Sequence, residues 1–286
     1  MDGVDISQSK SLQYSSVISE NFNNILKKIN IEHFWFIRIF HKDNSRIILT
    51  NYPQWVEHFY YEGFYKNLHI MDAEFLQGTG YYTWENLKTG RPFDDGVKYF
   101  MLHDGVTMLK KDNDYTDLYC FATSKEKLLD IDIIRKGRDL LDRFIFYFKE
   151  KSYNLIDEIS DSRIFLDNLY YKNTRYLNLK TGSSNKEIIE SFIRETTINK
   201  IFVTGSKYLT NQEALCIKHL INGKTAKEIA EILNISYRTV ESHISNVKKK
   251  FDFRKMQEAS YMLTELNFKS LFESDLLKSF DLEKIS

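Results

Sequence analysis

Basic and hydroxyl-bearing side chains gather between residues 224 and 250, where their chemistry suits nucleic acid. Lys and Arg neutralise phosphate oxygens, and Ser, Thr and Tyr hydroxyls can hydrogen-bond phosphates or base edges. The candidate phosphate-contacting residues are Lys224, Lys227, Arg238, Lys248, Lys249 and Lys250. Taken alone, a basic run such as Lys248–Lys250 is more often a solvated face than a binding site. The secondary structure predicted for this segment distinguishes between a solvated face and a binding site.

The segment 209–251 has the pattern of three short helices. They are expected at residues 211–221, 226–233 and 237–251. Thr210 and Thr225 each precede a glutamate by three residues, the spacing of a capping box, and Ser236 is the candidate N-cap of the third helix. Apolar residues recur at helical spacing on the inward side of the third helix, namely Val240, Ile244, Val247 and Phe251. Two short helices joined by a tight turn at Asn234–Ile235 predict a helix-turn-helix.

The same segment resembles the C-terminal DNA-binding domain of LuxR-type regulators. The matching residues are Leu209, Thr210, Glu213, Gly223, Thr225, Glu228, Ile229, Ala230, Leu233, Ser236, Thr239, Val240, His243, Val247, Lys250 and Phe251. The departures are Gln212 for Arg and Asp252 for Gly, and Phe251 matches only as an apolar residue where Leu is usual. None of them touches the helix-turn-helix itself. The resemblance implies a four-helix domain that binds double-stranded DNA, with a last helix at 257–266 that dimerises in the family. It also implies a homodimer and RNA polymerase as a further partner.

The third helix should act as a recognition helix, because such a helix fits the major groove and its N-terminal half meets base edges. Comparison with the family assigns base contacts mainly to Glu241, Ser242 and Ser245. The other candidate DNA-binding residues, besides the basic ones above, are Thr225, Tyr237, Thr239 and His243. His243 is interpreted as a packing or phosphate-contacting residue in preference to a metal ligand. Many relatives carry Lys or Arg where Glu241 stands. A carboxylate accepts a hydrogen bond from cytosine N4, so we hypothesise that Glu241 reads a C·G pair.

The N-terminal part of the chain predicts an α+β domain. Helices are expected at 16–29, 53–62 and 126–153, and strands at 33–40, 46–50 and 117–123. The sheet is expected to be antiparallel because no regular βαβ alternation is present. The predicted organisation is a flexible tail at 1–15, a sensor domain at 16–154, a bridging segment at 155–206, the DNA-binding domain at 207–268 and an acidic tail at 269–286. Within the bridging segment, 160–166 and 170–179 are strands or connectors, and 185–194 has a helical pattern.

A second resemblance covers roughly residues 16–150 and is to the autoinducer-binding domain of quorum-sensing LuxR-type proteins. Trp55, Phe59, Trp84 and the run 105–107 (Gly-Val-Thr) carry it. It implies an α/β/α sandwich with ligand-binding residues at Tyr52, Trp55, Phe59, Leu68 and Trp84. Phe59 lacks the hydroxyl of the family's tyrosine, and Leu68 stands where the family has aspartate. Two polar partners for the amide of a homoserine lactone are therefore missing, while Trp84 is retained.

Two interpretations of this domain stay open. Either it binds an apolar small molecule other than a standard acyl-homoserine lactone, or its own side chains fill the pocket and the regulator is constitutive or controlled by a partner. The missing polar partners favour the second. Aromatic residues at near-helical spacing, such as Trp55 and Phe59, are also more often core than pocket.

Composition narrows the remaining classes of function. The chain has 286 residues, of which 42% are hydrophobic, enough to exclude a mostly disordered chain, and its 2 cysteines exclude a disulfide framework. We expect a cytoplasmic protein that does not enter a membrane, because no signal peptide or apolar run of spanning length is present. We expect no enzyme, metal or cofactor, because the motifs of known catalytic sites are missing. The alternative is an enzyme or signalling domain fused to a DNA-binding module.

The net charge of zero, from 40 basic and 40 acidic residues, hides a segregation of charge. The net charge is −2 over residues 1–206, +5 over 207–255 and −3 over 256–286. The basic block coincides with the helix-turn-helix segment. Only this block is expected to show a strong salt-dependent attraction to DNA.

Overall fold

The computed structural model describes residues 3–66, 80–84, 90–124, 131–166, 186–255, 258–259, 261 and 271–272. Contacts divide the chain into two compact units. The first is Met1–Arg138 with Tyr153–Glu195, and the second is Asp139–Ser152 with Thr196–Ser286. These limits differ from the predicted domain limits, because one long helix contributes to both units and the second unit begins before residue 207.

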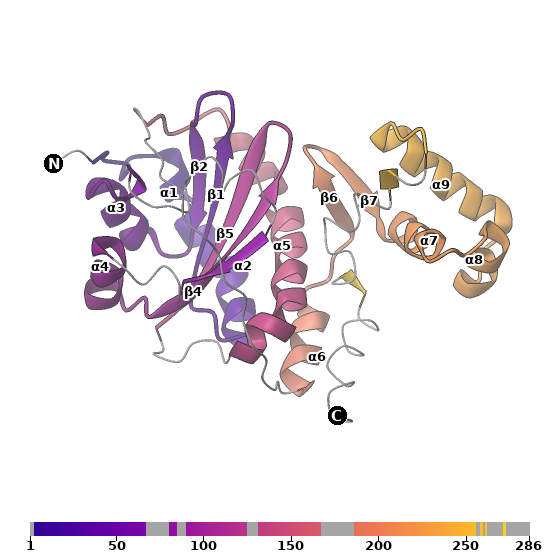
Figure 1. The fold of residues 1–286 in the computed structure, drawn as a ribbon, viewed down its shortest axis with the longest axis horizontal. Coiled ribbons are helices and arrows are strands. Elements are labelled where there is room, and N and C mark those ends of the chain that lie inside the picture. Colours follow the sequence, from indigo (N-terminus) through magenta and orange to yellow (C-terminus); the bar gives the residue numbers. More distant parts are fainter. Residues whose placement is uncertain are drawn as a thin grey trace. The chain divides into compact units, whose positions relative to one another are not determined.

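The first unit is built on a five-stranded antiparallel sheet (Figure 1). Its strands are β1 His33–Phe40, β2 Arg46–Thr50, β3 Gly80–Thr83, β4 Asp104–Lys111 and β5 Tyr115–Thr123. They lie in the order β2-β1-β5-β4-β3, and every neighbouring pair is antiparallel. The predicted antiparallel sheet is confirmed, and the predicted strands at 33–40 and 46–50 pair with each other as a hairpin.

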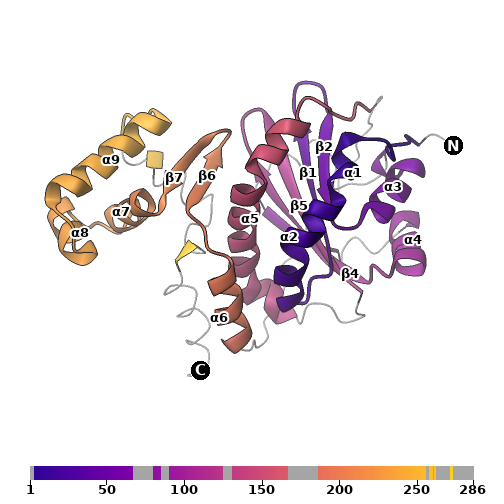
Figure 2. The same ribbon diagram turned by 180° about the vertical axis from the view of Figure 1, so that it is seen from behind.

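Helices cover both faces of this sheet. They are α1 Lys10–Gln13, α2 Ser15–Lys28, α3 Pro53–Tyr61, the short 3₁₀ helix η1 Phe64–Lys66, α4 Arg91–Phe100, α5 Ile131–Ile159 and α6 Lys186–Glu195. Trp35 and Ile37, on one face of β1, share a buried cluster with Trp55 and Tyr60 of α3. Phe36, between them in sequence, points to the opposite face and is also fully buried. Figures 1 and 2 show α3 and α4 together beside the sheet, with α2 on its far side. The predicted α/β/α layering is therefore present.

The described residues before α2 differ from the predicted flexible tail. Ile6 and Leu12 are buried in the same cluster as Trp55, and the N–H of Val4 donates to the carbonyl oxygen of Tyr60 at 3.0 Å. Two isolated apolar residues in a polar stretch give no periodic pattern. The sequence therefore offered no signal that this segment packs against α3.

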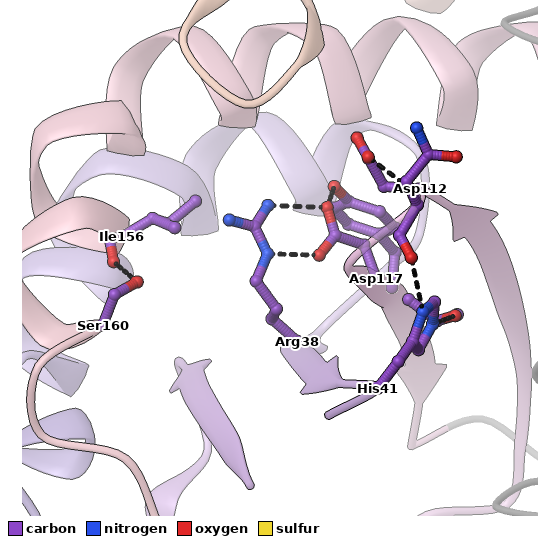
Figure 3. A network of polar contacts seen from close by, with 9 residues as sticks. Arg38, His41, Asp112, Asp117, Ile156 and Ser160 are labelled. Carbon is purple, nitrogen blue, oxygen red and sulfur yellow. Dashed lines mark hydrogen bonds and ion pairs between the residues drawn. The ribbon is translucent and has the colours of Figure 1, made fainter. Parts of the chain in front are cut away.

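A buried ion pair joins the neighbouring strands β1 and β5 (Figure 3). The register of β1 and β5 places Arg38 opposite Asp117, and two hydrogen bonds of 2.7 and 2.9 Å join the guanidinium to the carboxylate. Tyr119 donates a third hydrogen bond to Asp117 at 3.2 Å, and the guanidinium lies 3.7 Å from the centre of the Tyr115 ring. Burial opposes the charge on Arg38, but Asp117 raises the pKa of Arg38 above its usual value. Arg38 therefore keeps its charge inside the sheet layer.

The second unit contains a β-hairpin followed by three helices. These elements are β6 Lys200–Thr204, β7 Lys207–Thr210, α7 Asn211–Ile221, α8 Ala226–Leu233 and α9 Tyr237–Phe251. All three helices begin and end where the sequence predicts. The hairpin was not predicted, and β6 lies within the expected bridging segment. Most of the predicted last helix at 257–266, and all of 170–179, fall outside the described residues.

The middle of α5 forms part of this second unit. Phe146 is 3% exposed and joins a cluster with Ile201, Ile217 and Val247, which come from β6, α7 and α9. Arg143, one turn before Phe146, donates hydrogen bonds to the hydroxyl of Thr196 at 2.7 Å and to its carbonyl oxygen at 3.0 Å. The helix-turn-helix segment therefore shares its core with residues far before it in the chain.

Candidate nucleic-acid interface

Hydrogen-bonded caps fix the start of α8. The hydroxyl of Thr225 accepts from the N–H of Glu228 at 3.3 Å, and the Glu228 carboxylate accepts from the N–H of Thr225 at 2.8 Å. The backbone and hydroxyl groups of Thr225 and the nearby Lys224 lower the pKa of Glu228 to about 2. The predicted capping box is confirmed here, and the same box joins Thr210 to Glu213 at the start of α7.

The turn between α8 and α9 is equally defined. Asn234 adopts a left-handed conformation with φ of 52°, which ends α8 as its C-cap, and asparagine tolerates this region better than most residues. The N–H of Ile235 donates to the carbonyl oxygen of Ala230 at 3.1 Å. The hydroxyl of Ser236 then accepts from the N–H of Thr239 at 3.0 Å and caps α9. The hydroxyls of Ser236 and Thr239 lie 2.7 Å apart, so Thr239 belongs to the cap.

The two sides of α9 differ sharply in burial. Val240 and Val247 are fully buried, and they pack in two clusters that Ile244 joins on one edge. The opposite side is solvent-exposed, and it carries Tyr237, Arg238, Glu241, Ser242, Ser245 and Lys249. The structure thus brings the predicted base-contacting residues together on one exposed helical face, while His243 and Lys248 lie half-buried at its borders.

A hydrogen bond that the sequence did not indicate lies on this exposed face. The hydroxyl of Tyr237 donates to Oε1 of Glu241 at 2.7 Å, one helical turn further on. This contact raises the pKa of Tyr237, because losing the proton would place two negative charges side by side. The i, i+4 spacing was visible in the sequence, but the rotamers that bring the two side chains together were not.

Lys250, which the sequence predicts as a phosphate contact, forms an ion pair within the chain. Its ammonium group donates to both carboxylate oxygens of Glu213, at 2.8 and 2.7 Å. The Glu213 side chain is only 4% exposed. Burial alone would raise the pKa of Glu213, but the bonds from Lys250 and from the N–H of Thr210 lower it below the usual value. Lys250 therefore holds α9 against the start of α7, and we do not include it among the proposed phosphate contacts.

The other cations remain exposed or partly exposed. Lys224 lies 3.2 Å from Glu228 in a solvent-exposed pair, which is the weak kind of ion pair. Lys227 is exposed on the first turn of α8. Arg238 and Lys249 are exposed near the two ends of α9. A flexible cation in water can leave such a pair to meet a phosphate, in contrast to Lys250.

The residues predicted to bind a ligand lie in and around the cluster of the first unit. The rings of Trp55 and Phe59 are 5.8 Å apart, and the Tyr52 hydroxyl donates to the carbonyl oxygen of Phe100 at 3.1 Å. The indole N–H of Trp84 donates to the Thr107 hydroxyl at 3.1 Å. Gly105 allows this approach, because a Cβ there would lie 2.6 Å from the Trp84 ring. Leu68 falls outside the described residues.

The described residues offer neither a candidate metal site nor a membrane-spanning helix. They contain no group of three or more His, Cys, Asp or Glu side chains placed to hold a metal ion. Within the same residues, no helix combines the length and the apolar character needed to cross a membrane.

The C-terminal segment matches a known family. Residues 207–263 match the family described as bacterial regulatory proteins, luxR family, which confirms the predicted LuxR-type domain. The uncharacterized response regulatory protein YgeK of Escherichia coli (strain K12) is 48% identical over 49 residues. That alignment covers 17% of this chain and 33% of YgeK, so the two share about a third of the relative's length.

Two solved structures resemble the chain weakly over most of its length. The crystal structure of Escherichia coli SdiA is 16% identical and gives a TM-score of 0.35, over 91% of this chain and 92% of that one. A structure of SdiA in complex with octanoyl-rac-glycerol gives the same identity and TM-score over 88% of each chain. At this level of similarity we transfer no property of SdiA to this protein.

Proposed function

We propose that this protein is a transcription regulator that binds double-stranded DNA in a sequence-specific manner. The observation that carries the proposal is the division of α9 into a buried apolar side and an exposed polar side, directly after a capped turn. The match of residues 207–263 to the luxR family supports it. A helix held by its inner face can place its outer face in a major groove about 12 Å wide.

Within this proposal the exposed residues of α9 divide into two roles. Glu241, Ser242 and Ser245 face base edges, and Glu241 accepts a hydrogen bond from cytosine in a C·G pair. The phosphate contacts come from Lys224, Lys227, Arg238, Lys248 and Lys249, with Thr225, Thr239 and His243 beside them. Tyr237 lies on the same exposed face and bonds to Glu241. The net charge of +5 over residues 207–255 supports this assignment, because phosphate binding needs local positive charge.

The first unit, in this proposal, controls the activity of the second by binding a ligand or a partner. We favour a domain whose pocket is filled by its own side chains. The Trp84 N–H and the Tyr52 hydroxyl, which could serve a ligand, are both used within the chain. A thermal-shift measurement with a panel of standard acyl-homoserine lactones tests this. We expect no stabilisation, and a shift of several degrees would contradict the preference.

The proposal includes a cytoplasmic homodimer that acts on promoters together with RNA polymerase. Its central test is binding-site selection by the full-length protein from a pool of randomised duplexes. We expect a consensus for the wild type and a changed preference at one base pair for Glu241→Ala. Failure of the wild type to select any sequence would contradict sequence-specific binding. An unchanged consensus for the variant would remove Glu241 from base recognition.

A further inference from the structure

We propose that Tyr237 is a positioning residue for sequence recognition, and that its hydroxyl holds the Glu241 carboxylate in the orientation that reads a base. The inference rests on the proposed function and extends it to a residue that makes no base contact of its own. It begins from the 2.7 Å hydrogen bond between the Tyr237 hydroxyl and Oε1 of Glu241 on the exposed face of α9.

The hydroxyl of Tyr237 is suited to orient the carboxylate, and the carboxylate of Glu241 is suited to contact the base. A tyrosine hydroxyl has one proton to donate, so while it donates to Glu241 it cannot also donate to a phosphate. A carboxylate has several acceptor positions, so Glu241 keeps Oε2 available for a cytosine amino group. Hydrogen bonds to a charged acceptor are stronger than those between neutral groups, which makes this contact effective even at an exposed position.

The need for positioning follows from exposure. Glu241 is exposed, and a free glutamate on a helix surface moves among many rotamers. Fixing a side chain of this kind on binding costs enough to weaken a contact by about two- to tenfold. Tyr237 is 45% exposed as a whole residue, and it presents its hydroxyl from the capped first turn of α9. The raised pKa of Tyr237 keeps the hydroxyl protonated around neutral pH.

The test compares the full-length wild type with Tyr237→Phe, Glu241→Ala and the double variant. Affinity is measured for the selected consensus duplex and for duplexes in which each base pair is changed in turn. We expect Tyr237→Phe to lower discrimination about two- to tenfold at the base pair that Glu241 reads, with other positions unchanged. The double variant should behave like Glu241→Ala alone, because both changes remove one shared contact. Tyr99→Phe is the matched control, since Tyr99 is an exposed tyrosine of α4 at 59% exposure.

The possible failures are distinguishable. A uniform loss of affinity over all duplexes with Tyr237→Phe would assign Tyr237 to a phosphate and overturn the inference. Additive effects in the double variant, or a silent Tyr237→Phe beside an effective Glu241→Ala, would overturn it while leaving the proposed function intact. A wild type without a consensus would remove the basis of both. A silent Glu241→Ala would overturn the inference while leaving sequence-specific binding intact. If Tyr237→Phe folds poorly by circular dichroism, Glu241→Asp takes its place. The shorter side chain should no longer reach the Tyr237 hydroxyl, and discrimination should fall at the same base pair.

Discussion

Replacing Lys250 with methionine should loosen α9 from α7 without changing the outer face of α9. The methionine keeps most of the apolar stem of the lysine but removes the ammonium that contacts both oxygens of Glu213. Glu213 would then keep its charge at a site where its side chain is 4% exposed. The Glu213 carboxylate would still accept a hydrogen bond from the N–H of Thr210, at 2.8 Å.

The stability that the second unit should lose in Lys250→Met lies between the values for an exposed and for a buried ion pair. Exposed ion pairs contribute about 0–1 kcal/mol, and breaking a buried pair costs about 3–5 kcal/mol. The Lys250 side chain is 35% exposed while Glu213 is not, so water can reach one side of the pair. We therefore expect a loss of about 2 kcal/mol. Adding Glu213→Gln should recover at least half of it, because glutamine also completes a capping box and leaves no buried charge.

The assay must report on the second unit alone. All 3 tryptophans, at positions 35, 55 and 84, belong to the first unit, so tryptophan fluorescence does not follow the helix-turn-helix. Hydrogen exchange measured on peptides of α7 and α9 follows the helix-turn-helix directly, and it yields the free energy of local opening. Unchanged fluorescence would then serve as the control that the first unit is intact.

Two results would refute this reasoning. One is a change in opening free energy below about 0.5 kcal/mol, which is the range of ordinary surface substitutions. The other is a failure of Glu213→Gln to rescue the Lys250 variant. Acid offers an independent check. The folded pKa of Glu213 lies below its ordinary value of 4.5, so its contribution is complete above that pH and is lost as the pH falls through the folded pKa. The double variant should lack this acid-dependent loss.

Three further changes test other parts of the structure. Thr225→Ala removes the capping hydroxyl of α8 and should cost about 1 kcal/mol in hydrogen exchange of its first turn. The capping Glu228 has a pKa of about 2, so α8 should also loosen as the pH falls from 4.5 towards that value. Phe146→Ala empties a buried position and should cost about 3–5 kcal/mol, seen as faster exchange in the β6–β7 hairpin and α7. Lys249→Ala should reduce the salt dependence of DNA affinity by about one unit of slope, whereas Lys250→Met should leave that slope unchanged.

The sequence predicted the local structure of the helix-turn-helix well because its signals are short-range. Thr225 lies three residues before Glu228, and Ser236 lies directly before its helix, so each cap forms between near neighbours. The periodic spacing of Val240 and Val247 likewise identified the buried side of α9. Contacts of this kind depend on a few consecutive residues, and no other part of the fold can easily override them.

Long-range contacts were missed for the opposite reason. Lys250 and Glu213 are 37 residues apart, and nothing in either neighbourhood marks them as partners. Phe146 belongs to a helix that the sequence correctly predicted, yet its place in the core of the second unit depends on the tertiary fold. The same holds for Leu12, whose burial in the cluster on one face of the sheet requires the sheet to exist first. In each case the residue type was compatible with two environments, and only packing decided between them.

The ion pair between Lys250 and Glu213 also refines the meaning of the local charge. It removes one cation and one anion together, so the net charge of +5 over residues 207–255 is unchanged. The anion it removes is almost fully buried, whereas Glu241 stays on the exposed face of α9. The positive charge that faces solvent is therefore carried by fewer cations than the sequence count suggests, but fewer acidic groups compete with them. The salt dependence of DNA affinity should accordingly follow Arg238, Lys227 and Lys249, which are exposed, and should not follow Lys250.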